Sequence, residues 1–378
     1  MKRLITQLAL LIAVLCASVQ AHAYDCVVDG IYYNLNSSDN TAEVTEGDGN
    51  YGGAIKIPRS VRYNGSSYSV TSIGESAFYE CSGLTSVTIP NSVTSIGEYA
   101  FAHCSGLTSV TIPNSVMCID DYAFCGCSGL TSVTIPNSVQ WIGKAVFYGC
   151  TGLTSIVVDE NNTEFDGRDN CNAIIETATN TLITGCKSTI IPNSVESIGY
   201  AAFEGCSGLR SVTIPNSVTS INEEAFKDCS DLMSVTISNS VMWIGKSAFF
   251  ECHRLTSVTI GNSMTSIGEE AFRYCSSLTS VTIPNSVTSI GKFAFYGSGL
   301  TSVTIGNSVT SIGMYAFDCG LTSVTCLAPI PPECGSYALT EINKSKCTLY
   351  VLKESVNLYK VADQWKDFYN ISKYRGRR

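Results

Sequence analysis

Charged side chains are scarce in this chain of 378 residues. Asp, Glu, Lys and Arg together make up 15% of it, against about 25% in a typical soluble domain, so Ser, Thr, Asn and Gly must form most of the polar surface. Basic residues are scarcer than acidic ones, with 23 Lys and Arg against 32 Asp and Glu. The resulting net charge of −9 argues against nucleic acid as a partner, because neutralising phosphates requires a basic face.

Long hydrophobic runs are also missing. After residues 1–23 there is no run of about 18 apolar residues, the length that a transmembrane helix would need. Residues 1–23 themselves have a basic start, a short apolar run at 8–15 and a small-residue end, the pattern of a secretory signal peptide cleaved after Ala23. Cys16 raises the question of a lipid anchor, but the bulky Leu15 before it favours simple cleavage. We therefore expect a secreted or cell-surface protein without a transmembrane segment, in a compartment where disulfides are permitted.

Catalytic and metal-binding motifs are few. After residue 23 the histidines are His103 and His253, both in a variable turn, and neither neighbours a recurrent acid or nucleophile. The chain has no glycine-rich phosphate loop and no nucleophile elbow. It also lacks a Cys-x-x-Cys pair, and Cys125-Gly-Cys127 alone is a weak zinc signal. We predict that the protein is not an enzyme and that it has no catalytic residue, metal site or cofactor.

The sequence instead repeats a unit of 23 residues. Each unit is a near copy of Leu-Thr-Ser-Val-Thr-Ile-Pro-Asn-Ser-Val-Thr-Ser-Ile-Gly-x-x-Ala-Phe-x-x-Cys. In the first unit Val87 and Ile89 alternate with hydroxyl residues, which predicts a short half-buried strand. A second extended piece ends at Ile96, and the following Ala-Phe pair fits a single helical or 3-10 turn. The leucines that open these units form two series with this spacing: Leu84, Leu107, Leu130 and Leu153, and then Leu209, Leu232, Leu255 and Leu278.

A unit of this size cannot bury its own apolar side, so neighbouring units must stack to create the core. We therefore predict a repeat solenoid, mainly β, in a right-handed coil with parallel strands about 4.8 Å apart, short helical turns and terminal caps. The solenoid should span residues 69–325, after an N-terminal antiparallel β cap at 24–68. Residues 326–378 should form a C-terminal cap with a strand at 347–351 and a helix from Ser355. The apolar face of that helix would consist of Val356, Tyr359, Ala362, Trp365 and Phe368.

The pattern Cys-x-x-Leu-x-x-Val-x-Ile-Pro-x-x-Val-x-x-Ile-Gly-x-x-Ala-Phe resembles the Treponema-type leucine-rich repeat of the BspA-like bacterial surface proteins. The resemblance covers about residues 69–325. It implies a leucine-rich-repeat fold and a secreted or cell-surface location. It also implies a role in adhesion, because several members of the family are described as adhesins for host matrix proteins or as mediators of contact between bacteria.

The repeat is interrupted once, in the middle of the chain. Leu153 and Cys186, which occupies the leucine position of the next unit, lie 33 residues apart, so that ten residues are inserted. Two extended pieces around Ala178-Thr179 indicate a hairpin, which should protrude from the solenoid as an insertion at about 159–186. In such a hairpin Cys171 falls opposite Cys186, and we predict a disulfide between them.

The other cysteines are ambiguous. Most of them form one column of the repeat, in which consecutive members would lie within disulfide reach. Because the same position also accepts Ser298, the pattern favours a buried ladder of small apolar thiols. The pairing of four cysteines near the C-terminus, Cys319, Cys326, Cys334 and Cys347, cannot be assigned from sequence. The column consists of Cys81, Cys104, Cys127, Cys150, Cys206, Cys229, Cys252 and Cys275.

Two tryptophans interrupt the exposed surface of the repeat. The position before Ile-Gly is usually serine, but it holds Trp141 and Trp243. Met242 precedes Trp243, and Met117 occupies the corresponding place in the unit before Trp141. Large apolar groups on a hydroxylated face suggest a contact patch. The alternative is that each ring lies flat over the neighbouring coil as packing.

Two other exposed columns are less specific. Tyr99 and Tyr122 crowd the outer arc of the N-terminal half, where they would stack on a sugar or shield the turn. The first strand of each unit presents Ser and Thr as a flat hydroxyl array, which reads mostly as ordinary β surface. Similar arrays occur in ice-binding proteins, which gives a further hypothesis.

These patterns predict a secreted or cell-surface leucine-rich-repeat binding protein, an adhesin that recognises a host or bacterial surface protein through the solenoid. The candidate ligand-binding residues are Trp141, Trp243, Met117, Met242, Tyr99 and Tyr122. The partner would be a protein of the extracellular matrix or of another cell surface, or a glycan. The alternatives are a self-associating or coaggregating structural surface protein and, behind it, a glycan- or ice-binding protein.

Overall fold

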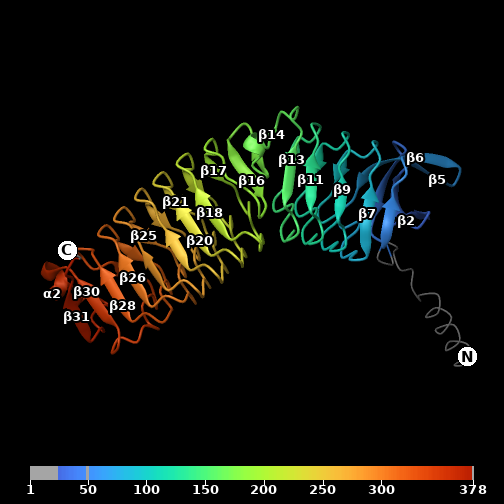
Figure 1. Cartoon of the computed structure of the whole chain (residues 1–378). Helices are drawn as coiled ribbons and strands as arrows, with labels where there is room; N and C mark the ends of the chain where they lie inside the picture. Colours follow the sequence, from blue (N-terminus) through green and yellow to red (C-terminus); the bar gives the residue numbers. More distant parts are fainter. Residues whose placement is uncertain (1–23, 48–50, 377–378) are drawn as a thin grey trace, which may run out of the picture.

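The computed structural model describes residues 24–47 and 51–376. Figure 1 shows an arc of stacked coils made almost entirely of strands and turns. The predicted repeat solenoid, mainly β with parallel strands, is confirmed. The predicted signal peptide lies outside the described residues. Within those residues the helical elements are α2 (Val356–Tyr359) and the 3-10 turns η1 (Arg168–Asn170) and η2 (Lys353–Ser355).

The first strand of each coil carries the Leu-Thr-Ser-Val-Thr segment and pairs in parallel with its neighbours, for example Val87 with Val110. Val87 is buried and Thr88 is exposed, because successive side chains of a strand point to opposite faces. We call the outward side of these strands the first-strand face. The first strands are β7 (Leu84–Thr88), β9 (Ser109–Thr111), β11 (Ser132–Ile135), β13 (Ser155–Val158), β18 (Ser211–Ile214), β20 (Ser234–Ile237), β22 (Ser257–Thr259), β24 (Ser280–Thr282), β26 (Ser302–Ile305), β28 (Ser323–Cys326) and β30 (Thr348–Val351).

The second strand of each coil is only two residues long and follows the turn after the first. Its second residue, such as Ile96, is buried, and the residue before it faces outward. We call this outward side the second-strand face. The second strands are β8 (Ser95–Ile96), β10 (Cys118–Ile119), β12 (Trp141–Ile142), β17 (Ser197–Ile198), β19 (Ser220–Ile221), β21 (Trp243–Ile244), β23 (Ser266–Ile267), β25 (Ser289–Ile290), β27 (Ser311–Ile312) and β29 (Glu333–Cys334).

Phenylalanine rings and thiols fill the remaining side of each coil, below a surface that we call the turn face. The buried rings of Phe226 and Phe249 stack with their centroids 5.1 Å apart. Beside them Cys252 donates its S–H to the carbonyl oxygen of Phe226 in the preceding coil, with an Sγ···O distance of 3.2 Å. The same bond recurs at Cys104, Cys127, Cys150, Cys229 and Cys275. The cysteines are free thiols, so the predicted buried ladder is confirmed.

The N-terminal unit is continuous with the sheets of the solenoid. Strands β1 (Cys26–Val28), β2 (Ile31–Asn36) and β3 (Thr41–Thr45) form an antiparallel meander. Strand β3 then pairs in parallel with β6 (Ser66–Ile73), which also pairs with β8. Because β6 begins before residue 69 and ends after it, it crosses the expected boundary between cap and solenoid. Strand β5 (Ser60–Tyr63) is antiparallel to β6, whereas β4 (Gly53–Lys56) adds in parallel to β7.

The C-terminal cap contains less helix than the sequence predicts. The 3-10 turn η2 leads into a single α-helical turn, α2, and Gln364 adopts a positive φ of 62°. The apolar residues still point inward: Trp365 is fully buried and donates its indole N–H to the carbonyl oxygen of Pro332 at 2.9 Å. A further strand, β31 (Asn370–Lys373), pairs in parallel with β30. The predicted helix is therefore wrong beyond its first turn, although the inward face was identified.

The insertion divides the solenoid into two blocks. Strands β12 and β13 end their sheets, and β14 (Phe165–Asp166) begins another. The buried side chains likewise form two separate clusters. We call the coils up to β13 the N-terminal block and those from β14 onward the C-terminal block. Figure 1 shows the interruption between β13 and β16.

The hairpin predicted to protrude instead lies inside this junction. Strands β15 (Ala173–Glu176) and β16 (Thr181–Gly185) are antiparallel, and β16 pairs in parallel with β17. Ile174 packs in the hydrophobic cluster of the N-terminal block and Ile175 in that of the C-terminal block, and both are fully buried. The expected protrusion is wrong because the two coils that face each other across the junction would expose apolar side chains that must be covered, and β15 contributes a side chain to each cluster.

Candidate functional site

The two tryptophans occupy outward positions of the second-strand face. Trp141 is 57% exposed and Trp243 is 37% exposed, whereas the following residues, Ile142 and Ile244, are buried. The strand alternation alone explains this arrangement, because the isoleucine must fill the core and the residue before it must then point outward.

The difference in exposure follows from the sheet order. Strand β12, which carries Trp141, pairs only with β10 and ends its sheet at the junction. Strand β21, which carries Trp243, lies between β19 and β23. Trp243 therefore has a neighbouring coil on each side, and Trp141 has a strand neighbour on one side only.

An exposed methionine lies near each tryptophan along the backbone. Met117 is 43% exposed, and its carbonyl oxygen accepts hydrogen bonds from the backbone N–H groups of Gln140 and Trp141 at 2.8 and 3.1 Å. Met242, directly before Trp243, is 49% exposed. We call Met117 with Trp141 the first Trp-Met patch, and Met242 with Trp243 the second. They lie in different blocks.

The indole groups of both patches have no partner among residues 24–47 and 51–376. Neither Trp141 nor Trp243 stacks on another ring or donates its indole N–H in a hydrogen bond there. Trp365, in contrast, is fully buried with its N–H bonded. The interpretation that each exposed ring lies over a neighbouring coil fits the lower exposure of Trp243 better than that of Trp141.

Tyr99 and Tyr122 lie apart from these patches, in the turn that follows the second strand. Their positive φ angles of 53° and 56° place the rings on the turn face, where they stack with centroids 5.1 Å apart and planes 6° from parallel. Burial raises the pKa of both phenols. The structure therefore pairs the two tyrosines with each other and not with the Trp-Met patches.

A polar cluster on the turn face bridges the junction, and no sequence pattern indicated it. Tyr148 of the N-terminal block donates its hydroxyl to Asp228 Oδ2 of the C-terminal block at 3.4 Å. Nearby, Lys144 Nζ lies 5.5 Å from the ring centroid of Tyr200. Because Tyr148 and Asp228 are 80 positions apart in the chain, no local pattern could have connected them.

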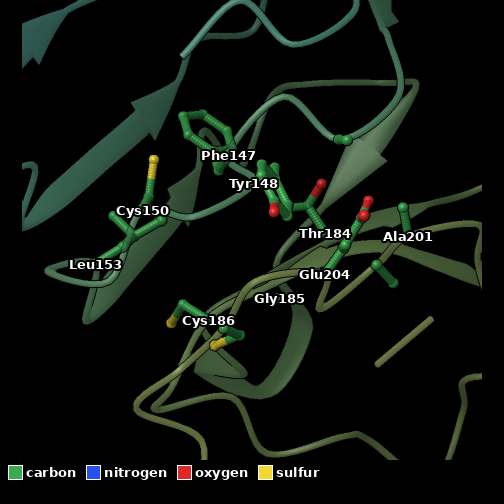
Figure 2. A pocket seen from close by; sticks show the side chains of 12 residues that line it. Phe147, Tyr148, Cys150, Leu153, Thr184, Gly185, Cys186, Ala201 and Glu204 are labelled. Carbon is green, nitrogen blue, oxygen red and sulfur yellow. The ribbon is translucent and has the colours of Figure 1, made fainter. Parts of the chain in front are cut away.

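Glu204 is the most constrained member of this cluster. It is only 8% exposed, and its Oε1 forms an ion pair with Lys227 Nζ at 2.9 Å, while Oε2 has no hydrogen-bond partner among the described residues. Burial raises the pKa of the Glu204 carboxyl, and Lys227 opposes that effect. Figure 2 shows Glu204 and Thr184 facing Tyr148 across a cavity of about 20 Å³, which has room for about one water molecule.

The predicted disulfide between Cys171 and Cys186 is not formed, and both residues are free thiols. A β-bulge between Ile174 and Ile175 shifts the register of the hairpin, so Cys171 no longer falls opposite Cys186. Cys171 packs in the hydrophobic cluster of the C-terminal block, and Cys186 in that of the N-terminal block. The sequence-based prediction was wrong because it assumed a hairpin without a bulge.

Metal-ligand and membrane features are lacking in the described part of the chain. No group of three or more His, Cys, Asp or Glu side chains within residues 24–47 and 51–376 is placed to hold a metal ion. Among the helices of those residues, none has the length and apolar character to cross a bilayer.

Comparison with known structures identifies similar solenoids. The crystal structure of the pneumococcal vaccine antigen PcpA is 19% identical and has a TM-score of 0.62, with 95% of this chain and 100% of that chain covered, which supports the fold. A leucine rich cell surface protein from Faecalibacterium prausnitzii A2-165 is 25% identical over 91% of this chain and 97% of that chain, with a TM-score of 0.46. The Leucine Rich Repeat protein of T. pallidum is 26% identical over 61% of this chain and 90% of that chain, with a TM-score of 0.38.

No curated protein matches the chain. The pattern of the BspA type Leucine rich repeat region, in contrast, matches six copies over residues 71–180, 182–264 and 243–349. These ranges cover most of the solenoid, and they agree with the resemblance that the repeat motif indicated. The chain therefore belongs to the BspA-type leucine-rich-repeat family.

Proposed function

We propose that this chain is a secreted or surface-displayed binding protein that recognises another protein through the two Trp-Met patches of its second-strand face. Its family supports a binding role, since leucine-rich-repeat proteins generally bind proteins. The basic, apolar and small-residue pattern of residues 1–23 supports export. The partner would be a protein of the host matrix or of another cell surface.

The exposure of Trp141 and Trp243 carries this proposal. Serine is the usual residue at their position, so the fold does not require an aromatic ring there. Tryptophan offers a large apolar surface with one hydrogen-bond donor, and it is enriched at the centres of protein interfaces. An exposed ring that the fold does not need is best explained by contact with a partner.

The mechanism follows from the placement of the patches in two blocks of one stacked solenoid. Each patch is small, so each contact would be weak on its own. A partner long enough to reach both would gain from the second contact without a further loss of translational freedom. The hydroxyl groups around each patch would form the polar rim that surrounds an apolar anchor in typical interfaces.

The test is binding of residues 24–378 to a panel of immobilised matrix proteins and glycans. We expect saturable binding to a protein ligand, weakened about tenfold or more by Trp141→Ser or Trp243→Ser, since central tryptophans often contribute about 2 kcal/mol. Tyr369→Ser is the matched control, because Tyr369 is 80% exposed and lies outside both patches. Equal losses in all three variants would contradict the proposal.

A folded preparation that binds none of these ligands would favour one of the alternative functions. A mass that rises with concentration in light scattering would then favour self-association. Binding to bacterial surface proteins alone would favour coaggregation. Thermal hysteresis in freezing solutions would be the sign of ice binding, and ordinary freezing would eliminate that hypothesis.

A further inference from the structure

The first-strand face is hollowed at its C-terminal end. A groove of about 1230 Å³ lies on this face, and residues 373–376 line one side of it. The floor consists of outward side chains from β24, β26, β28, β30 and β31, and the wall consists of Lys373, Tyr374, Arg375 and Gly376. The flat hydroxyl array expected from sequence is therefore a trough here.

The strand register sets the floor of the groove. Thr282, Thr304 and Thr325 occupy one column, and the same column continues through Tyr350 to Ser372. Neighbouring members are about 4.8 Å apart, the spacing of paired strands. Thr282 is exposed, whereas Thr304 and Thr325 are half-buried, so the column passes from open surface into the groove.

The hydroxyl groups of this column are free to bind a ligand. Elsewhere in the repeat, threonine hydroxyls bond to a backbone carbonyl of the preceding coil, as Thr301 does to Thr279 and Thr322 does to Thr301 at 3.2 and 3.1 Å. The hydroxyls of Thr304 and Thr325 have no hydrogen-bond partner in the part of the chain that the structure describes. The groove is thus lined by donors and acceptors that the fold does not use.

The wall supplies positive charge to an otherwise acidic protein, whose net charge is −9. The backbone N–H of Tyr374 donates to the carbonyl oxygen of Val351 at 2.7 Å, which holds the wall against β30. Lys373 and Arg375 are exposed and form no ion pair within the described residues. Two unpaired cations therefore lie beside a row of free hydroxyls.

The floor does not suit an extended peptide. Strands β26, β28 and β30 each pair with a neighbour on both sides, so the middle of the floor offers no free backbone edge for strand addition. Only β24 and β31, at the two ends of this sheet, have an unpaired side within it. Ile371 is the one aliphatic side chain in the lining of the groove. The middle of the groove is therefore poorly suited to bind a peptide through backbone pairing or through apolar anchors.

We infer that this groove binds an acidic oligosaccharide. The hydroxyls of Thr304 and Thr325 exchange hydrogen bonds with sugar hydroxyls, and the rings of Tyr350 and Tyr374 pack against the apolar faces of the sugars. Lys373 and Arg375 bind the acidic groups through charge-assisted hydrogen bonds, which are about twice as strong as neutral ones. The ligand class and the location both differ from those of the Trp-Met patches.

The test is calorimetric binding of residues 24–378 to oligogalacturonate and to dextran sulfate, with neutral dextran and polyglutamate for comparison. We expect saturable binding to an acidic sugar. Oligogalacturonate binding would assign carboxylated sugars, and dextran sulfate binding would assign sulfated ones. Lys373→Gln with Arg375→Gln should weaken binding about a hundredfold or more, since hydrogen bonds to charged groups contribute about 1.5–3 kcal/mol each and the double variant removes two of them.

The threonine variants separate a built site from simple charge attraction. Thr304→Val with Thr325→Val should also weaken binding, by about fivefold or more at roughly 0.5–1.5 kcal/mol per hydrogen bond. The controls Thr111→Val with Thr134→Val and Lys353→Gln with Lys360→Gln should bind within about twofold of the parent, because these residues lie outside the groove.

Three results would overturn the inference: no saturable binding to either acidic sugar, equal binding of polyglutamate, or full binding by the threonine variant. The Trp141→Ser and Trp243→Ser variants should bind the sugar normally. Failure of the groove and failure of the protein-binding proposal are therefore distinguishable.

Discussion

Cysteine suits its position in the repeat because the thiol both fills space and forms a bond. The sulfur packs beside the phenylalanine column, and its S–H reaches a backbone carbonyl of the preceding coil, as from Cys104 to Phe78 at 3.0 Å. Burial raises the pKa of Cys104 to about 12. A thiol that stays protonated is a poor nucleophile, so the ladder is chemically inert while the protein is folded.

This leads to a prediction about alkylation. At pH 8 we expect iodoacetamide to modify Cys118, which is half-buried, much faster than Cys104, whose raised pKa leaves almost no thiolate. After unfolding without reductant, Cys171 and Cys186 should both react, because no disulfide joins them. Peptide mass spectrometry measures each site. Equal native rates at Cys104 and Cys118, or blocked Cys171 and Cys186, would contradict this account.

Glu204 provides a second test at the residue scale. Burial raises the pKa of its carboxyl above the usual value, so the folded state binds the proton more tightly than the unfolded state. The contribution of Glu204 to stability is therefore largest at low pH and is lost as pH rises through its folded pKa. Glu204→Gln, which mimics the protonated form, should gain stability relative to the parent chain between pH 4 and pH 7.

Urea unfolding of Glu204→Gln and of the parent chain at both pH values measures this difference. Glu269→Gln is the control, because Glu269 lies on the surface with its side chain 41% exposed and pairs with Lys246 at 3.4 Å. A difference between Glu204→Gln and the parent that does not change with pH would show that the carboxyl is not perturbed by burial.

At the scale of elements, the repeat was predictable because its pattern is periodic and stacking is the only way to bury it. The alternation of Val87 and Ile89 with hydroxyl residues already indicated the first strand, and the outward position of Trp141 followed from the same alternation. The C-terminal helix was overpredicted, because spacing every three residues identifies an inward face without showing that the backbone between is helical. Trp365 is buried as expected but lies in a turn.

The junction was only partly predictable. The position of the hairpin could be identified from the insertion, but its packing depends on two blocks that the local sequence does not describe. The β-bulge after Ile174 has no signal in the sequence that we recognise. The contacts of Tyr148 and Glu204 join segments far apart in the chain, so they arise only from the stacking of the complete solenoid.

The packing of β15 against both blocks can be tested with two neighbouring substitutions. Ile174→Ala should loosen the N-terminal block and Ile175→Ala the C-terminal block, because the two side chains pack in different hydrophobic clusters. Each should lower the stability of its block by about 2–5 kcal/mol, as for other fully buried isoleucines. Hydrogen exchange of peptides from the two blocks measures where protection is lost. Loss of protection in the same block for both variants would contradict the packing of β15 between the two blocks.

At the scale of the whole molecule, the solenoid places its candidate sites on different faces. The second-strand face carries one Trp-Met patch in each block, the first-strand face carries the C-terminal groove, and the turn face carries the polar contacts that join the blocks. The aromatic patches were predictable because they break a repeated pattern. The groove was not, because it depends on how β31 and the residues after it fold back beside the hydroxyl column.

The most direct test of the account is the affinity of the Trp141→Ser, Trp243→Ser double variant for the protein ligand identified in the binding panel, with its free energy of unfolding measured by urea titration of the same preparation. The account predicts binding at least about a hundredfold weaker and a free energy of unfolding within about 0.5 kcal/mol of the parent, because both side chains are exposed. Unchanged affinity in a folded double variant would contradict it and leave both tryptophans as packing residues.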